Sequence, residues 1–177
     1  MGVVLVDEAV SDAELIDRHL RGDSEGFAGL YRRYAPALHL YAQALMRDAD
    51  AACDLVQETF VRAMDAAGLR GSARPMLYTI ARNLAADERR KADVRRRARP
   101  LLALAARADA PPPSHDAEAV SLALDALPDE QREAVVLKIY AGLGFAEIAE
   151  LTGVSTATAA SRYRYAIEKL AGLLPAK

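Results

Sequence analysis

The stretch "FAEIAELTGVSTATAASRYRYAIEKLAGLL", residues 145–174, has the spacing of two helices joined by a tight turn. Gly153 supplies the turn, because glycine adopts a left-handed backbone without steric cost. Ser155 is placed to cap the second helix, and Ala149 is small enough to let the two helices approach. The pattern predicts a helix-turn-helix, whose second helix enters the DNA major groove. Short helical hairpins in ordinary bundles share this spacing, so spacing alone leaves both interpretations open.

Two more helices are predicted just before this stretch. "AVSLALDAL", residues 119–127, ends at Pro128, and "PDEQREAVVLKIYAGLG", residues 128–144, follows it. The second has acidic residues in its first turn, where the helix dipole favours them. Its predicted inward-facing side chains are Val135, Val136, Ile139 and Tyr140.

A proline run, Pro111 to Pro113, separates these helices from the rest of the chain. Consecutive prolines cannot continue a helix, so an extended linker is predicted over residues 100–118. The chain is thereby divided into an N-terminal domain, residues 1–99, and a C-terminal domain, residues 119–177.

The N-terminal domain has four helical segments with apolar residues at three- and four-residue steps. They cover residues 11–23, 24–48, 48–68 and 76–98, with a loop from Gly68 to Pro75. Pro36 lies inside the second and is expected to bend or interrupt it. The third is predicted to bury one side, formed by Ala52, Leu55, Val56, Phe60 and Ala63.

Composition agrees with an all-α fold of two small domains. Of the 177 residues, 52% are hydrophobic and 27% charged, as in soluble globular proteins. No run approaches the length of a membrane helix, and the N-terminus lacks the features of a secretory signal, so a cytoplasmic protein is expected. One cysteine and three scattered histidines give no disulfide framework and no metal-ligand spacing.

The formal net charge of −2 hides a strongly basic middle. Residues 62–99 carry 11 basic and 4 acidic side chains, whereas the segments on either side are acidic. The basic residues concentrate in "RNLAADERRKADVRRRAR", residues 82–99. A basic block between acidic flanks suggests a polyanionic partner, although an isolated charge run is more often a solvated helix face.

Four stretches in order resemble a bacterial RNA polymerase sigma factor of the extracytoplasmic-function (ECF) group. They are "FAGLYRRYAPALHLYA", "DLVQETFVRAM", "LRGSARPMLYTIARNLAADERRK" and the segment from "LPDEQREAVV" to "YAIEKL". The resemblance implies promoter recognition for core RNA polymerase, with promoter DNA and a probable anti-sigma factor as further partners. It also implies a monomer when free, without membrane contact, cofactor, metal or enzymatic activity.

The same resemblance assigns residues to each partner. Polymerase contacts are expected from the outward face of the third helix: Asp54, Gln57, Glu58 and Arg62. The loop and the following helix are expected to recognise the minus-ten element, through Arg70, Gly71, Ser72, Arg74, Tyr78, Arg82 and Asn83. The segment after these residues is expected to contact DNA phosphates, through Arg89, Arg90, Lys91 and Arg95 to Arg97.

The minus-thirty-five element is expected to contact the second helix of the helix-turn-helix, through Ser155, Thr156, Thr158, Ser161, Arg162 and Arg164. Arg162 is the best candidate for a guanine edge or a phosphate. The chain departs from the family at Met76, where a tryptophan is usual, and at Ala160, where a lysine is common. This helix is therefore less basic than usual, and the domain is expected to bind DNA weakly by itself.

Two other interpretations are compatible with the sequence. One is a stand-alone helix-turn-helix regulator whose N-terminal half senses a signal or dimerises. The other is a helical interaction module without a nucleic-acid role. An enzyme is least favoured, because no catalytic triad, phosphate-binding glycine loop or metal spacing is present.

Overall fold

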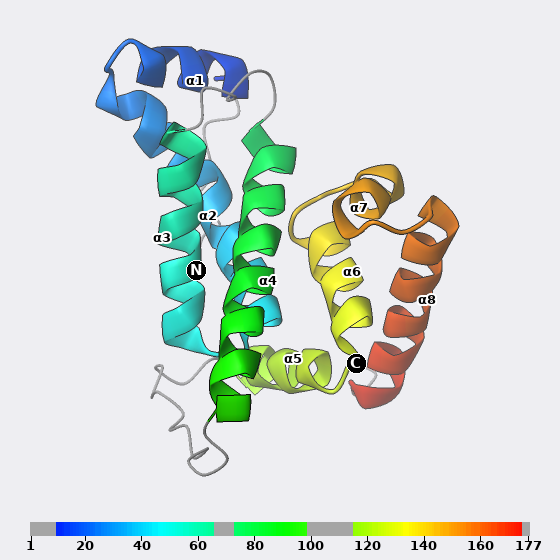
Figure 1. Ribbon diagram of the computed structural model, residues 1–177. Coiled ribbons are helices and arrows are strands. Elements are labelled where there is room, and N and C mark those ends of the chain that lie inside the picture. The colour runs from blue at the N-terminus through cyan, green and yellow to red at the C-terminus, as the bar shows by residue number, and fades with distance from the viewer. Residues whose placement is uncertain (1–9, 66–72, 99–114, 175–177) are drawn as a thin grey trace.

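The computed structural model describes residues 10–65, 73–98 and 115–174, which form eight α-helices (Figure 1). The N-terminal half contains α1 (Asp12–Leu20), α2 (Ser24–Met46), α3 (Ala49–Asp65) and α4 (Ala73–Ala98). The C-terminal half contains α5 (His115–Asp125), α6 (Asp129–Ile139), α7 (Phe145–Thr152) and α8 (Thr156–Leu173). No strand occurs in these ranges, which confirms the all-α prediction.

In the N-terminal half, α2 packs against α1, α3 and α4. All five α3 residues predicted to face inward are buried: Ala52, Leu55, Val56, Phe60 and Ala63. The stripe on α2 is buried at Leu30, Tyr34, Leu38, Tyr41 and Leu45, while Tyr31 is exposed beside the Phe60 ring. Apolar periodicity therefore located most of this core.

Pro36 was expected to bend or interrupt its helix; it does not interrupt it, since α2 runs from Ser24 to Met46 across it. Proline removes the hydrogen bond to the carbonyl of the residue four positions earlier, here Arg32. Both Arg32 and Pro36 are exposed, so water is available to that carbonyl.

In the C-terminal half, α7 and α8 form the predicted helix-turn-helix. Gly153 has φ 72°, the left-handed conformation that the turn requires. The Ser155 side chain accepts a hydrogen bond from the Thr158 N–H at 3.1 Å, as a capping residue does. Ala149 is buried at the turn and Ala159 in the first turns of α8.

The predicted linker, residues 100–118, is too long at its C-terminal end, because α5 begins at His115. A proline restricts its own backbone and that of the preceding residue, so it does not prevent a helix from starting soon after it. Residues 99–114 lie outside the described part of the chain.

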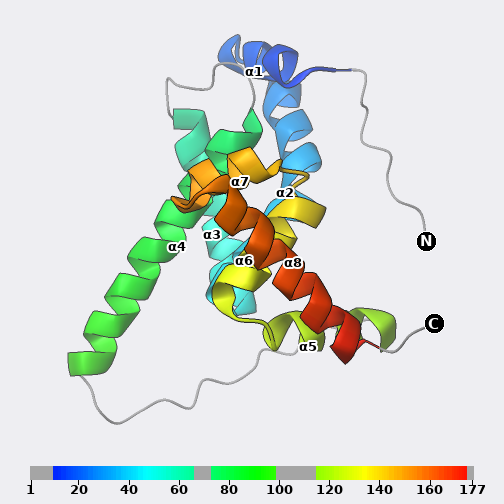
Figure 2. The ribbon, with the colours of Figure 1, turned by 90° about the vertical axis from the view of Figure 1, so that its right-hand side faces the viewer.

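The two halves pack on each other, with α6 against α2 and α7 against α4 (Figures 1 and 2). One continuous cluster of buried apolar side chains contains residues of both halves, including Leu38 and Tyr78 from the first and Leu137 and Leu143 from the second. A smaller cluster of Leu127, Val135 and Ala166 belongs to the C-terminal half alone.

The contact between the halves changes which side of α6 is buried. Val135 and Val136 are buried as predicted, but Ile139 is 53% and Tyr140 40% exposed, so the inward assignment of these two is wrong. Arg132 and Glu133 are buried instead, at 1% and 8% exposure. Periodicity within α6 could not reveal this, because the N-terminal half covers a side of the helix that carries charge.

Candidate functional site

The outward face of α3 is polar and open to solvent. Asp54, Gln57, Glu58 and Arg62 are all exposed, opposite the buried stripe. The Arg62 Nε atom lies 2.7 Å from a Glu58 carboxylate oxygen, one helical turn away. This face presents carboxylates and an amide to a partner without disturbing the core behind it.

Helix α4 begins at Ala73, earlier than predicted, so Arg74 and Pro75 belong to its first turn. Proline is tolerated there because the first N–H groups of a helix have no intrahelical partner. The Ala73 N–H donates to the Asp12 Oδ2 atom at 3.0 Å, which caps α4 from a different helix. Arg70, Gly71 and Ser72 lie outside the described residues.

Asp12 is held by three donors and ties α1 and α2 to the start of α4. Arg33 Nη1 lies 2.6 Å from its carboxylate, and the Tyr34 hydroxyl donates to the same group. Burial acts to raise the pKa of Asp12, but the hydrogen bonds from Tyr34, Arg33 and Ala73 outweigh it and hold that pKa below its ordinary value. Burial, together with the Asp12 bond, raises the pKa of Tyr34 to about 12. The sequence showed Asp12 only as an acidic residue in a first turn.

The next two predicted DNA-facing residues of α4 contact other parts of the protein. Arg74 donates to the Gly142 carbonyl oxygen at 3.3 Å. Tyr78 is 1% exposed, packs edge-on against Tyr41 with ring centres 5.2 Å apart, and cannot face DNA in this arrangement. Its buried hydroxyl has no hydrogen-bond partner in the described part of the chain. Burial raises the pKa of that hydroxyl well above its ordinary value.

One turn further along α4, Arg82 is bound by a buried acid of α6. Its Nε atom lies 3.0 Å from the Glu133 Oε1 atom, and the Tyr41 hydroxyl donates to the same oxygen at 2.8 Å. Burial, reinforced by the Glu133 charge, raises the pKa of Tyr41 well above its ordinary value. Asn83, on the neighbouring position, is exposed.

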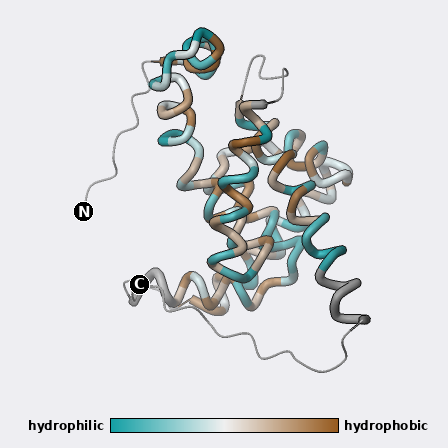
Figure 3. Tube along the Cα trace, turned by 60° about the vertical axis from the view of Figure 1, so that its left-hand side comes forward, coloured by the Kyte–Doolittle hydropathy of each residue, from teal (hydrophilic) through white to brown (hydrophobic). Residues whose placement is uncertain are grey.

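The last coloured turns of α4 are hydrophilic (Figure 3), and the charges there divide into two sets. Arg90 and Lys91 are exposed and pair with Asp87 and Glu88 on the same helix. Arg89 instead donates to the Leu45 carbonyl of α2 and lies 3.9 Å from Asp129 of α6. The side chains of Arg95 to Arg97 lie outside the described part.

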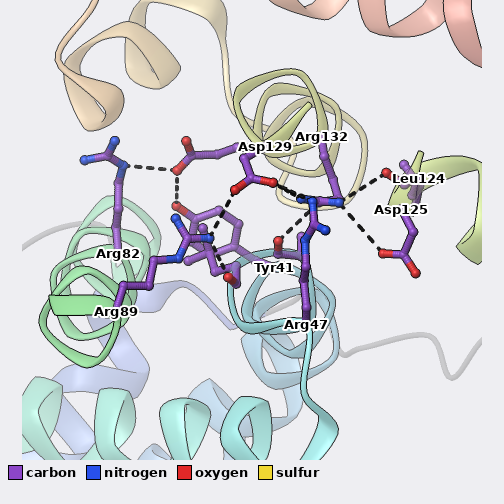
Figure 4. Close-up of polar contacts among 11 residues, drawn as sticks. Tyr41, Arg47, Arg82, Arg89, Leu124, Asp125, Asp129 and Arg132 are labelled. Atoms are coloured by element: carbon purple, nitrogen blue, oxygen red, sulfur yellow. Dashed lines mark hydrogen bonds and ion pairs between the residues drawn. The ribbon is translucent and has the colours of Figure 1, made fainter. Parts of the chain in front are cut away.

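Asp129 and Arg132 extend this network along α6 (Figure 4). Asp129 accepts from Arg47 at 2.6 Å and from Arg132. Arg132 also donates to the carbonyl oxygens of Ala44, at 3.2 Å, and Leu124, at 3.4 Å. Burial acts to raise the pKa of Asp129, but the arginines that contact its carboxylate outweigh this effect. They hold the pKa of Asp129 below its ordinary value. Sequence reasoning missed this network, since nothing in a single helix distinguishes a charge buried by a distant segment from a solvated one.

Four of the six predicted DNA residues at α8 are exposed to solvent. Ser155, Thr156, Thr158 and Arg164 are exposed, while Ser161 and Arg162 are half-buried. Arg164 lies over the Tyr165 ring, 5.0 Å from its centre, and pairs weakly with Glu168 at 3.9 Å. Helix α8 packs on α5, α6 and α7, within its own half.

Together these features define a helical two-part protein with an exposed helix-turn-helix, a basic helix and a separate acidic face. Residues 30–107 match the family Sigma-70 region 2, and residues 117–170 match Sigma-70, region 4. None of the described helices has the length and apolar character needed to cross a membrane.

Relatives resemble the chain over nearly its whole length. It is 35% identical over 93% of its residues to the ECF RNA polymerase sigma factor SigM of Mycobacterium tuberculosis, and covers 85% of that protein. It is 33% identical to the RNA polymerase sigma factor CarQ of Myxococcus xanthus, covering 90% of this chain and 95% of that one. The chain therefore belongs to the ECF RNA polymerase sigma factors.

Two solved structures share the fold. The sigma factor RpoE of Bartonella quintana, solved with the anti-sigma factor NepR, matches with a TM-score of 0.69 and 28% identity over 83% of this chain and 95% of that one. CnrH, solved with the cytosolic domain of CnrY, matches with a TM-score of 0.63 and 25% identity, covering 92% and 96% of the two chains.

Proposed function

We propose that this sigma factor binds core RNA polymerase, directs it to particular promoters and is controlled by an anti-sigma protein. The observation that carries the proposal is the presence of region 2 and region 4 in one chain, in that order. Control by an anti-sigma protein is supported by the RpoE relative, which was solved in complex with one.

The decisive experiment is in vitro transcription with core polymerase and a library of promoter DNA. We expect a selected set of promoters with a common upstream and a common downstream element. If no template yields a transcript that depends on this protein, the proposal is wrong. A protein that binds promoter DNA but does not co-purify with core polymerase would instead be a stand-alone regulator.

We assign polymerase binding to the outward face of α3, comprising Asp54, Gln57, Glu58 and Arg62. Exposed carboxylates there suit a basic partner surface, where charge complementarity speeds association and fixes orientation. The variant Glu58→Lys should weaken binding to core polymerase by about tenfold, which is the effect of roughly 1.4 kcal/mol.

The matched control is Asp17→Lys on α1. Asp17 pairs with Arg21 at 2.7 Å one turn later, as Glu58 pairs with Arg62 at the same distance. Both variants lose an exposed ion pair and gain a lysine, so equal effects on polymerase binding would contradict the assignment.

We assign the downstream element to α4 and the loop before it, and the upstream element to the start of α8. Arg90 and Lys91 are exposed at the basic end of α4 and suit phosphate contacts, which carry little sequence information. Replacing both with glutamine should reduce the salt dependence of promoter binding by the polymerase complex and leave the promoter preference unchanged. A changed preference would show that these residues read bases.

Arg162 is the residue of α8 that we propose to contact a base of the upstream element. A bidentate arginine–guanine contact is worth about 1–3 kcal/mol of discrimination, so Arg162→Ala should relax the preference at one position of the upstream element. Unaltered selection at every upstream position would remove Arg162 from this role.

A further inference from the structure

We propose that Asp12 is a positioning residue for promoter recognition, because it fixes from α1 the first turn of α4, the helix assigned to the downstream element. The inference rests on the proposed function, since that assignment is itself a proposal. Asp12 carries a negative charge, which DNA phosphates repel, so it acts through α4 and not by contact with DNA.

Helix α1 is packed closely on α2 at two glycines. A Cβ atom at Gly26 would overlap the backbone of His19 and Leu15. A Cβ atom at Gly29 would lie 2.6 Å from the Leu15 side chain. Leu15 is buried, as is Ile16 beside it. Contacts this close leave α1 little room to shift on α2, so the first turn of α1 has a fixed position.

The carboxylate of Asp12 is oriented by two side chains of α2. Arg33 donates to it from Nη1 at 2.6 Å and also donates to the Val10 carbonyl oxygen. The Tyr34 hydroxyl donates to its Oδ2 atom. The side chains of Asp12 and Arg33 are only 14% and 19% exposed, where a charged hydrogen bond is stronger than at an open surface.

The third bond of this carboxylate leaves α1 and α2 and goes to the first residue of α4. The Ala73 N–H donates to the Asp12 Oδ2 atom at 3.0 Å. The first N–H groups of a helix have no partner inside it, and a carboxylate also suits the positive end of the helix dipole. Ala73 is 1% exposed, so without Asp12 its N–H would be buried and unpaired. Figure 1 shows α1 at the end of the bundle where α4 begins.

The capped residue lies at a junction that matters for recognition. Residues 70–72, assigned to the downstream element, directly precede Ala73 in the sequence, and Arg74 follows it. Groups that recognise a ligand discriminate well only when supporting contacts hold them in place. Loss of the cap at Ala73 is therefore expected to weaken the discrimination between bases of the downstream element.

Hydrogen exchange, followed by nuclear magnetic resonance, tests the cap in the free protein. The Ala73 amide should exchange about fivefold faster in Asp12→Ala than in the unchanged protein, the factor that a typical capping bond supports. The two residues are 61 positions apart, so the substitution leaves the intrinsic exchange rate of this amide unaltered. The Glu25 amide, capped by Asp23 at 2.9 Å on α2, is the internal reference and should keep its rate.

Promoter selection with core polymerase tests the consequence. The transcript yield with the best base is compared with that of the worst base at every position of both elements. Asp12→Ala should reduce this ratio by about fivefold at the downstream element, the lower end of what one base contact provides, and by less than about twofold at the upstream element. A protein that is merely less stable loses transcript from all promoters alike, so the ratio separates positioning from stability.

The matched control is Glu14→Ala in the same turn of α1. Glu14 lies 2.6 Å from Arg18. Asp12 lies at the same distance from Arg33. Each variant loses one carboxylate and one ion pair, but of these two acids only Asp12 bonds to α4 within the described residues. Glu14→Ala should leave the exchange of the Ala73 amide and the downstream preference unchanged.

Asp12→Asn tests rescue, because it keeps an oxygen acceptor for the Ala73 N–H. It should restore slow exchange of that amide and most of the downstream preference. An asparagine variant that selects promoters as the alanine variant does would contradict the role of the cap. Should Asp12→Ala lose helicity by circular dichroism, Tyr34→Phe replaces it, since it removes one bond that orients the carboxylate. It should shift both measurements in the same direction, to a smaller extent.

The inference is overturned if Asp12→Ala leaves the exchange of the Ala73 amide unchanged, because the cap would then hold nothing. It is also overturned if this amide exchanges faster while the downstream preference is unaltered, or if both elements lose preference equally. If no variant and not even the unchanged protein gives promoter-specific transcription, the proposed function fails instead, and the exchange rates still decide whether Asp12 holds α4.

Discussion

Helices α6 and α8 belong to the same half of the protein and are buried to very different extents. In α6, six consecutive residues from Arg132 to Leu137 are buried, so no side of that segment is open. In α8, which is longer, only Ala159 and Ala166 are buried. Helix α6 lies between α8 and the N-terminal helices, whereas the main contacts of α8 are with α5, α6 and α7 of its own half (Figure 1).

This difference in burial distinguishes a helix that connects the two halves from a helix that is open to a binding partner. A helix that buries an arginine and a glutamate pairs these charges with polar groups of a neighbouring domain. Those pairs then fix how the two domains are arranged. In α8, four of the residues expected at DNA are exposed: Ser155 at its cap, Thr156, Thr158 and Arg164.

The largest expected effect comes from Arg132. Arg132→Met keeps much of the buried volume but removes the donor to the Ala44 and Leu124 carbonyls and to Asp129. The free energy of unfolding, measured with urea, should fall by about 3 kcal/mol. Arg164→Met in α8, at an exposed ion pair, should change it by less than about 0.5 kcal/mol. Similar losses at both sites would break the comparison between the helices.

Asp12→Ala tests an anchor of α4 that does not involve α6. It removes the acceptor of Arg33, Tyr34 and the Ala73 N–H, and should lower the free energy of unfolding by about 2 kcal/mol at neutral pH. The pKa of Asp12 is lowered by folding, so its contribution is present above the ordinary value of 3.8 and is lost as the pH falls below it.

Urea unfolding at a series of pH values checks this directly. The difference between the unchanged protein and Asp12→Ala should shrink as the solution becomes more acidic than about pH 4. A difference that is independent of pH would mean that the Asp12 charge contributes nothing.

Ser155→Ala addresses the start of α8. Loss of the cap to the Thr158 N–H should cost about 1 kcal/mol of stability. Urea unfolding measures this loss. A free energy of unfolding equal to that of the unchanged protein would show that the cap does not stabilise α8.

The smallest effect is expected at the exposed end of α6. Ile139→Ala should alter the free energy of unfolding by less than about 0.5 kcal/mol, because the side chain is 53% exposed. Val136→Ala, at a buried position three residues earlier, should cost more than about 1 kcal/mol. Urea unfolding of the two variants compares the faces of one helix, and a larger loss at Ile139 would contradict the observed burial.

Much of the fold could be predicted because local rules operate within single helices. The cap at Ser155, the turn at Gly153 and the buried stripe of α3 depend on residues a few positions apart. The open face of α3 follows from the same stripe, since the residues between the buried ones must point outward. The exposure of Asp54, Gln57, Glu58 and Arg62 therefore followed from the sequence.

Other features could not be predicted, because they depend on segments far apart in the chain. The cap of α4 comes from Asp12, and the partners of Glu133 come from α2 and α4. For the same reason Tyr78, expected to face DNA, is buried, and Ile139, expected to face inward, is exposed. Sequence periodicity gives the side of a helix that is apolar, but it does not give the sides that a second domain covers.

By itself, the sequence determined the helices, the helix-turn-helix, the basic segment and the family, because each depends on nearby residues or on ordered motifs along the chain. The tertiary structure alone decided which of the described arginines of α4 are bound by other helices and which pair within α4. The physical reason is that a charge is solvated or paired according to what lies against it in space, and here the partner is a domain on the other side of a linker.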